Sequence, residues 1–148
     1  MKIIVLYLLC LCSVSQAMEI KALKCESQTN PTGITTSRPS FSWTFIGDEN
    51  SSKQGGFRIM MATSIEKLKY PDLWDTGPTS KSETGPYQYL GEPLKSGQKV
   101  YWKVTVWGNN RGVVHSEPAW FVMGDIVNPE IAFEPPVFEQ KDGVIKIP

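Results

Sequence analysis

The sequence predicts an all-β domain in which about seven short strands form a sandwich of two sheets. The clearest strand is Val100–Trp107, where valines and Trp102 alternate with polar and aromatic residues. Alternation with a period of two, rich in β-branched and aromatic residues, is typical of a half-buried strand. Similar segments recur along the chain, separated by Gly, Pro and Asn turn signals roughly every ten residues. Because the apolar side of each strand needs a facing layer, two stacked sheets are expected.

The first half of the chain contains three predicted strands. Glu19–Ser27 is the first, and the turn-forming sequence Asn30–Gly33 follows it. In Pro39–Phe45, aromatic residues alternate with Ser and Thr, which predicts a second strand. Gly47–Gly56 is rich in Gly and Ser and is expected to be a loop, with Gly55-Gly56 at its tip. The third predicted strand is Phe57–Thr63.

One short helical turn is expected after the third strand. Ser64 is a suitable N-cap, Ile65 and Leu68 are spaced to share one face, and Pro71 blocks further helix.

The second half contains four more predicted strands. Leu73–Thr76 is short and is expected at a sheet edge, and Tyr87–Leu90 is bounded by Pro and Gly. Val100–Trp107 follows. The last strand combines Val113–Val114 with Ala119–Met123, and its interruption near Pro118 is compatible with an edge position.

The inward positions of these strands predict the hydrophobic core. The expected core residues are Leu23, Phe41, Trp43, Phe45, Phe57, Ile59, Met61, Leu94, Val100, Trp102, Val104, Val106, Phe121 and Met123.

The chain is divided into three parts. Residues 1–17 have a positive Lys2, an apolar run and small residues before a cleavage point after Ala17, which predicts a signal peptide. The alternatives are a retained membrane anchor or a lipid on Cys10 or Cys12. From the predicted signal peptide we expect an exported protein, periplasmic or extracellular, with no membrane span after cleavage. Residues 18–124 form the sandwich, and residues 125–148 are a Pro-containing C-terminal extension or linker.

Charge and cysteine content narrow the function classes. The chain has 15 Lys plus Arg and 15 Asp plus Glu, and loss of Lys2 with the leader leaves one net negative charge. This balance offers no basic surface to nucleic acid, so no nucleic-acid partner is expected.

Cys25 is the one cysteine outside the leader and is expected to be a small buried apolar residue. The alternatives are a reactive thiol or an intermolecular disulfide.

No arrangement of residues predicts catalysis. Glycoside hydrolysis needs two carboxyl groups that flank a cleft, whereas the loop carboxylates are expected to be solvated surface charges: Asp48, Glu49, Glu83, Glu92, Glu117 and Asp125. His115 is the single histidine, without the partners of a zinc site or a catalytic triad. We therefore predict no catalytic residue, no metal and no cofactor.

Four aromatic residues are the candidate binding residues. Tyr101, Trp107 and Trp120 are predicted to point away from the core, and Trp74 lies on a predicted edge strand. Exposed aromatic rings can stack on sugars or contact a protein partner. The alternative is that they pack under loops or against a neighbouring domain.

Seven segments resemble, in the same order, the N-terminal fibronectin type III-like module of bacterial α-L-rhamnosidases, an immunoglobulin-like sandwich. They are Leu23–Glu26, Asn30–Ile34, Arg38–Trp43, Asp72–Gly77, Leu94–Gly97, Tyr101–Trp107 and Ser116–Gly124. The chain departs from the family at Val100, where an aromatic is common, and at His115, where tryptophan is usual.

The resemblance implies a place in glycan degradation. In that family the catalytic carboxylates belong to a separate (α/α)6 barrel, so no residue here inherits them and this chain alone is expected not to be an enzyme. We expect an exported, non-catalytic accessory module whose partner is a neighbouring glycoside hydrolase domain or protein, or a glycan. The alternatives are a fragment or split part of a glycoside hydrolase, and a carbohydrate-binding module that uses exposed tryptophans.

Overall fold

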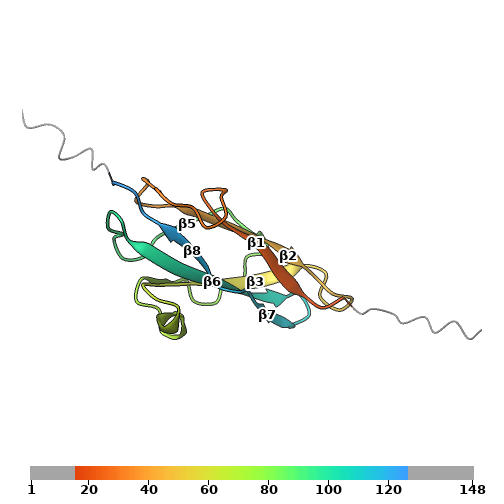
Figure 1. Cartoon of the computed structure of the whole chain (residues 1–148). Helices are drawn as coiled ribbons and strands as arrows, with labels where there is room; N and C mark the ends of the chain where they lie inside the picture. Colours follow the sequence, from red (N-terminus) through yellow and green to blue (C-terminus); the bar gives the residue numbers. More distant parts are fainter. Residues whose placement is uncertain (1–15, 127–148) are drawn as a thin grey trace, which may run out of the picture.

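A computed structural model describes residues 16–126 as a β-sandwich (Figure 1). Its elements are β1 (Glu19–Cys25), β2 (Ser40–Ile46), β3 (Gln54–Ala62), the 3₁₀ turn η1 (Glu66–Lys69), β4 (Trp74–Asp75), β5 (Tyr87–Gln88), β6 (Lys99–Gly108), β7 (Val113–His115) and β8 (Ala119–Val122). One sheet has the order β1-β2-β5, and the other has β4-β3-β6-β7 with β8 also paired to β6. All strand pairs between these elements are antiparallel. The predicted all-β, two-sheet fold is confirmed.

The interruption of the last predicted strand produces two short strands. β7 pairs with Thr105–Trp107 and β8 pairs with Lys99–Trp102, along the edge of β6 that does not face β3. Ser116 bridges the gap, because its N–H donates to the Val104 carbonyl at 2.8 Å and its Oγ accepts from the Val104 N–H at 2.9 Å. The ladder is therefore held by a side chain where the backbone leaves its regular path.

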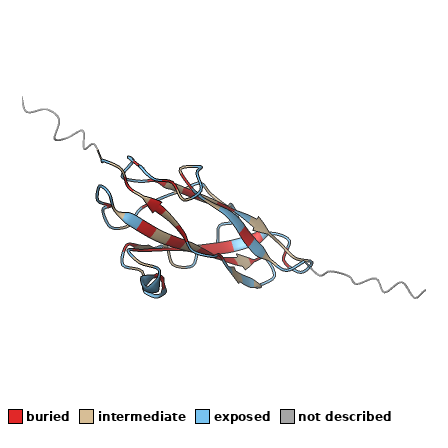
Figure 2. Cartoon of the chain, in the orientation of Figure 1, coloured by how far each residue is buried: buried red, intermediate tan, exposed pale blue. Residues whose placement is uncertain are grey.

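The core lies between the two sheets, as the buried residues in Figure 2 show. The predicted core residues are buried, with two exceptions: Leu23 and Phe45 are only partly buried at its margin. Ile34, Leu73 and Tyr89 join the core without having been predicted, because they lie outside the long alternating strands. Cys25 is buried, as expected, with 1% of its surface exposed.

The predicted loop up to Gly56 is wrong, since β3 already begins at Gln54. Gly56 lies opposite Trp107 in the β3–β6 ladder, after a bulge. A Cβ atom on Gly56 would lie 2.2 Å from the carbonyl oxygen of Thr79. Glycine therefore serves here to let a neighbouring segment approach the strand, and not to make a loop tip.

Two other local predictions need correction. The first strand ends at Cys25, because Glu26 and Ser27 have positive φ angles of 49° and 63° and begin a turn. Ile65 and Leu68 do not share a buried face: Leu68 is buried, whereas Ile65 is exposed. The reason is that η1 packs on β3 and β6 through Leu68 while Ile65 stands at its beginning.

The predicted signal peptide lies outside the described residues except for Gln16 and Ala17, and the predicted extension does so except for Asp125 and Ile126. Within residues 16–126, no helix has the length and apolar character needed to cross a membrane.

Candidate functional site

Two of the four candidate aromatic residues lie together on the outer side of the larger sheet. Tyr101 and Trp120 are directly opposite each other in the β6–β8 ladder. The Lys99 ammonium lies 5.2 Å from the Tyr101 ring centroid and 4.6 Å from the Trp120 ring centroid. We call Lys99, Tyr101 and Trp120 the outer aromatic group. Its rings are already covered in part by a cation.

Trp107 is separated from that group. It lies near the opposite end of β6, where its partners are Gly56 and Val113. At the rise of an extended strand, Trp107 and Tyr101 are about 20 Å apart along β6. One sugar ring therefore cannot contact both residues.

Trp74 faces the interior and not the outer surface. Among the strands that the structure describes, its strand β4 pairs with β3 alone, which confirms the predicted edge position. The indole ring lies 6.5 Å from the Phe41 ring and 5.3 Å from the Tyr89 ring, measured between centroids. Trp74 is partly buried, so it belongs to the margin of the core and also reaches solvent.

Trp74 lines a hollow between the edge strands of the two sheets. Strands β4 and β5 each end one sheet, whereas β1 and β7 contact each other along the opposite side. The hollow has a volume of about 610 Å³. We call it the β4–β5 hollow; its lining residues are Phe57, Trp74, Asp75, Thr76, Thr79, Lys81, Pro86, Tyr87, Gln88 and Leu90.

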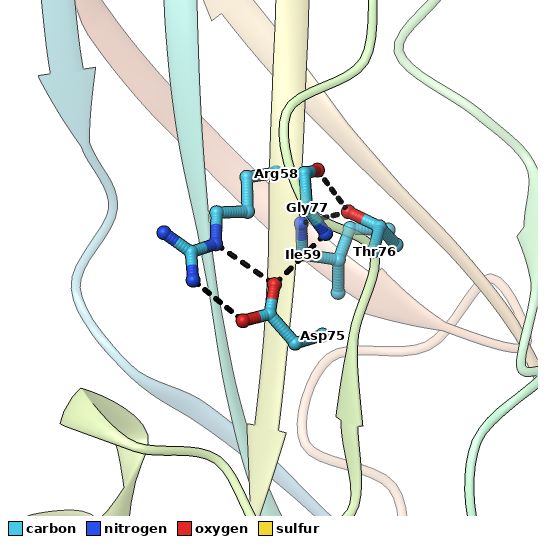
Figure 3. A network of polar contacts seen from close by, with 5 residues as sticks. All are labelled: Arg58, Ile59, Asp75, Thr76 and Gly77. Atoms are coloured by element: carbon cyan, nitrogen blue, oxygen red, sulfur yellow. Dashed lines mark hydrogen bonds and ion pairs between the residues drawn. The ribbon is translucent and has the colours of Figure 1, made fainter.

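The polar wall of the hollow on β4 is fixed by an ion pair. Arg58 Nε donates to Asp75 Oδ1 at 2.8 Å, and Arg58 Nη2 donates to Asp75 Oδ2 (Figure 3). The Gly77 N–H also donates to Asp75 Oδ1, at 2.9 Å. The hydrogen bond from Arg58 is the main cause that lowers the pKa of Asp75. Asp75 is therefore ionised and occupied by Arg58.

The threonines of this wall are occupied as well. Thr76 Oγ1 donates to the Gly77 carbonyl at 2.8 Å and accepts from the Ile59 N–H at 3.0 Å. Thr79 Oγ1 donates to the Phe57 carbonyl at 3.0 Å. These bonds tie residues 76–79 to the edge of β3 and make this side of the hollow rigid.

Comparison with known proteins assigns the fold to a family. Residues 20–126 match the model of the family described as Rha78A-like, N-terminal immunoglobulin domain. The chain belongs to this family. The resemblance predicted from the sequence segments is confirmed.

The relatives are much longer than this chain. An α-L-rhamnosidase of Formosa agariphila is 33% identical over 101 residues, which cover 66% of this chain and 11% of the relative. The α-L-rhamnosidase of Streptomyces avermitilis, solved in complex with L-rhamnose, has a TM-score of 0.69 and 28% identity, and the match covers 73% of this chain and 11% of that one. The α-L-rhamnosidase of Dictyoglumus thermophilum has a TM-score of 0.70 and 31% identity, with 78% and 13% covered. The Rha78A-like domain described here thus spans about a tenth of the length of these relatives.

Asp72 and His115 of this Rha78A-like domain make structural contacts. Burial raises the pKa of Asp72, but hydrogen bonds from Lys67 and Thr63 outweigh it and lower the pKa to about 2. His115 Nδ1 lies 2.9 Å from Thr105 Oγ1. Within residues 16–126, no group of three His, Cys, Asp or Glu side chains is placed to hold a metal ion.

Gln54 and Tyr87 are two of the residues at or near the hollow that are not candidates from the sequence. The buried Gln54 amide accepts from Trp43 Nε1 at 2.9 Å and donates to the carbonyls of Lys81 and Glu83. It therefore fixes the segment that leads to Tyr87. No local sequence signal marks Gln54, because its partners lie 11 to 29 residues away along the chain.

Proposed function

We propose that this chain is an exported, non-catalytic β-sandwich module that accompanies glycan degradation by α-L-rhamnosidase-type proteins. The observation that carries the proposal is the family match over residues 20–126, to a domain that makes up about a tenth of the α-L-rhamnosidases it resembles. The activity named for those proteins belongs to chains with far more sequence than this one.

Two carboxylates that are held in ion pairs support a non-catalytic role. A glycosidase needs a general acid whose pKa is raised, so that it holds a proton at neutral pH. Asp72 and Asp75 have lowered pKa values and are paired with Lys67 and Arg58. Their arrangement is that of structural ion pairs.

A hydrolysis assay tests this role. The purified full chain is incubated with an aryl α-L-rhamnoside, and a full-length α-L-rhamnosidase serves as the positive control. We expect no release of the aryl group above the buffer blank. Release that co-elutes with the chain through two further purification steps would contradict the proposal.

Export is tested by expression in a bacterial host with its own signal peptidase. The leader sequence supports cleavage after Ala17. We expect the recovered chain to begin at Met18, as measured by intact mass, and to appear in the periplasm or medium. An uncleaved chain retained in the cytoplasm would contradict export.

A second candidate function is a split or truncated part of a glycoside hydrolase. The length of the relatives favours this candidate, because the match covers only 11% of each α-L-rhamnosidase. The remaining part of such a protein is what this domain would accompany. Reading the DNA downstream of Pro148 separates the possibilities. An open frame that continues into a barrel-length sequence favours this candidate, and a stop codon with no adjacent hydrolase gene argues against it.

A third candidate is a carbohydrate-binding module that uses Trp107 and Trp120. The distance between these residues favours two separate contacts over one sugar subsite. The test is the double variant Trp107→Ala/Trp120→Ala in a glycan-binding measurement. If this variant keeps every affinity of the unchanged protein, the candidate fails.

A further inference from the structure

We infer that the β4–β5 hollow is a binding site for one pyranose ring of a glycan. The inference rests on the proposed association with glycan degradation and adds the place and the residues of contact. The hollow has the volume of ordinary small-ligand sites, at about 610 Å³. It lies between β4 and β5, the two-residue edge strands that end the two sheets on the same side of the sandwich.

The floor of the hollow offers aromatic surface from both sheets. Trp74 comes from the edge of the larger sheet and Tyr87 from the edge of the smaller one. The Tyr87 ring is supported from behind by Phe57 and Trp43, with centroids 4.4 and 5.7 Å away. The Lys81 ammonium lies 5.5 Å from the centroid of the same Tyr87 ring. A ring held in this way loses little entropy when the C–H groups of a sugar pack beside the ammonium.

Polar side chains that make no hydrogen bond or ion pair stand at the rim. Lys81 and Gln88 are exposed, and their side chains have no hydrogen bond or ion pair within residues 16–126. The indole N–H of Trp74 has no partner there either, and because the described part has no buried polar atom left unpaired, this N–H must reach solvent. These three side chains can donate to the hydroxyl oxygens of a sugar.

The other polar groups of the lining explain why the site is preformed. Asp75, Thr76 and Thr79 are committed to Arg58 and to the backbone of residues 57–59 and 77. Gln54 holds the carbonyls of Lys81 and Glu83 from the other side. A ligand therefore meets fixed walls and a few free donors, which is the usual composition of a small-molecule site.

The short edge strands favour a sugar over an added peptide strand. A peptide that extends a sheet needs a run of free backbone groups along one edge. The strands β4 and β5 have two residues each. Recognition at this place must depend on side chains.

The experiment titrates the ¹⁵N-labelled full chain with methyl α-L-rhamnopyranoside and, as a control, with the open-chain polyol sorbitol. We expect saturable shifts of the Trp74 indole signal and of amides in residues 74–90 with the glycoside and none with sorbitol. Shifts confined to the outer aromatic group, equal shifts with sorbitol, or no saturable shift would each overturn the inference.

Three variants assign the contacts. Lys81→Ala and Trp74→Phe, which keeps an aromatic ring but removes the donor, are expected to weaken binding about five- to tenfold each. Lys99→Ala removes a lysine that also lies over aromatic rings, but on the outer face, and should leave the affinity unchanged. Melting temperatures confirm that each variant is folded, and unchanged affinity in folded Lys81→Ala and Trp74→Phe would overturn the assignment.

The outcome is separable from that of the proposed function. If the chain neither binds the glycoside nor hydrolyses the aryl rhamnoside, the inferred sugar site is wrong and the proposed non-catalytic role still holds. If the chain hydrolyses the aryl rhamnoside, the proposed non-catalytic role is wrong, whether or not the titration shows binding.

Discussion

The Trp43 side chain packs against other aromatic rings in the core and also makes a buried hydrogen bond there. Its ring lies 5.0 Å from Phe57 and 5.7 Å from Tyr87, between centroids, and its N–H donates to Gln54. Truncation leaves a cavity and an unpaired buried amide oxygen, so Trp43→Ala should lower the free energy of unfolding by about 3–5 kcal/mol. Urea denaturation measures the change, with the outer-face variant Trp107→Ala as a milder control. A Trp43→Ala variant with an unchanged melting temperature would show that the ring is not part of the core.

Cys25 should be inert in the native chain. Burial is the main cause that raises the pKa of its thiol to about 12, and the charge of Glu26 adds to it. The thiolate is the reactive form, so alkylation at mildly alkaline pH should be negligible in the folded state and complete in guanidinium chloride. Mass spectrometry of the peptide that carries Cys25 gives the extent of alkylation. Rapid native labelling would favour the alternative of a reactive thiol.

At the scale of elements, Ser116 bridges the gap between β7 and β8 along the edge of β6. Its Oγ is the acceptor for the buried N–H of Val104. Because Ser116→Ala leaves that N–H without a partner, we expect a loss of about 1–3 kcal/mol in the free energy of unfolding. The exposed Ser52→Ala serves as the matched control, with a change within about 0.5 kcal/mol. Equal effects of the two substitutions would show that the gap between β7 and β8 does not depend on this contact.

The connection from η1 to β4 contains a pH-dependent contact. Asp72 accepts from the N–H and hydroxyl of Thr63 and from Lys67, and its pKa falls from 3.8 to about 2. A carboxyl whose folded pKa is depressed stabilises the fold above its unfolded pKa, and this contribution is lost as the pH falls through the folded value. Asp72→Asn should therefore be less stable than the unchanged chain at neutral pH.

The difference between the two chains should shrink from about pH 3.8 downward and disappear near pH 2. Thermal melts across this range measure it. A difference that stays constant with pH would mean that the charge of Asp72 contributes nothing.

The long strands could be predicted from sequence because their alternation is local. In β2 and β6, inward residues such as Trp43 and Trp102 follow the period of two without help from distant segments. The hollow could not be predicted, because Trp74 and Tyr87 come from the edges of different sheets and line one hollow only in the folded chain. The role of Gly56 could not be predicted for the same reason, because it depends on Thr79, which approaches from outside the strand.

The whole molecule is organised around the β3–β6 ladder. β6 has β3 on one edge and β7 and β8 on the other, so its backbone groups are paired on both sides along most of its length. β3 is paired with β6 along nearly its whole length, and with β4 and residues 76–79 on its outer edge. β4 and β5, by contrast, have two residues each and lie at sheet edges.

In native-state hydrogen exchange, the amide exchange rate should therefore depend on whether a strand is central or at an edge of its sheet, and not on its hydrophobicity. We expect the slowest amides in the central residues of β3 and β6, because their release requires both neighbours or the whole fold to open. Amides of β4, β5 and β7 should exchange faster, through local opening at the edges. The Ser116→Ala variant supplies an internal check, since it should speed exchange at Val104 more than at Ile59, which lies opposite it on β3. Slowest exchange in β1, or equal rates in edge and central strands, would mean that the β3–β6 ladder is not the most stable part of the fold.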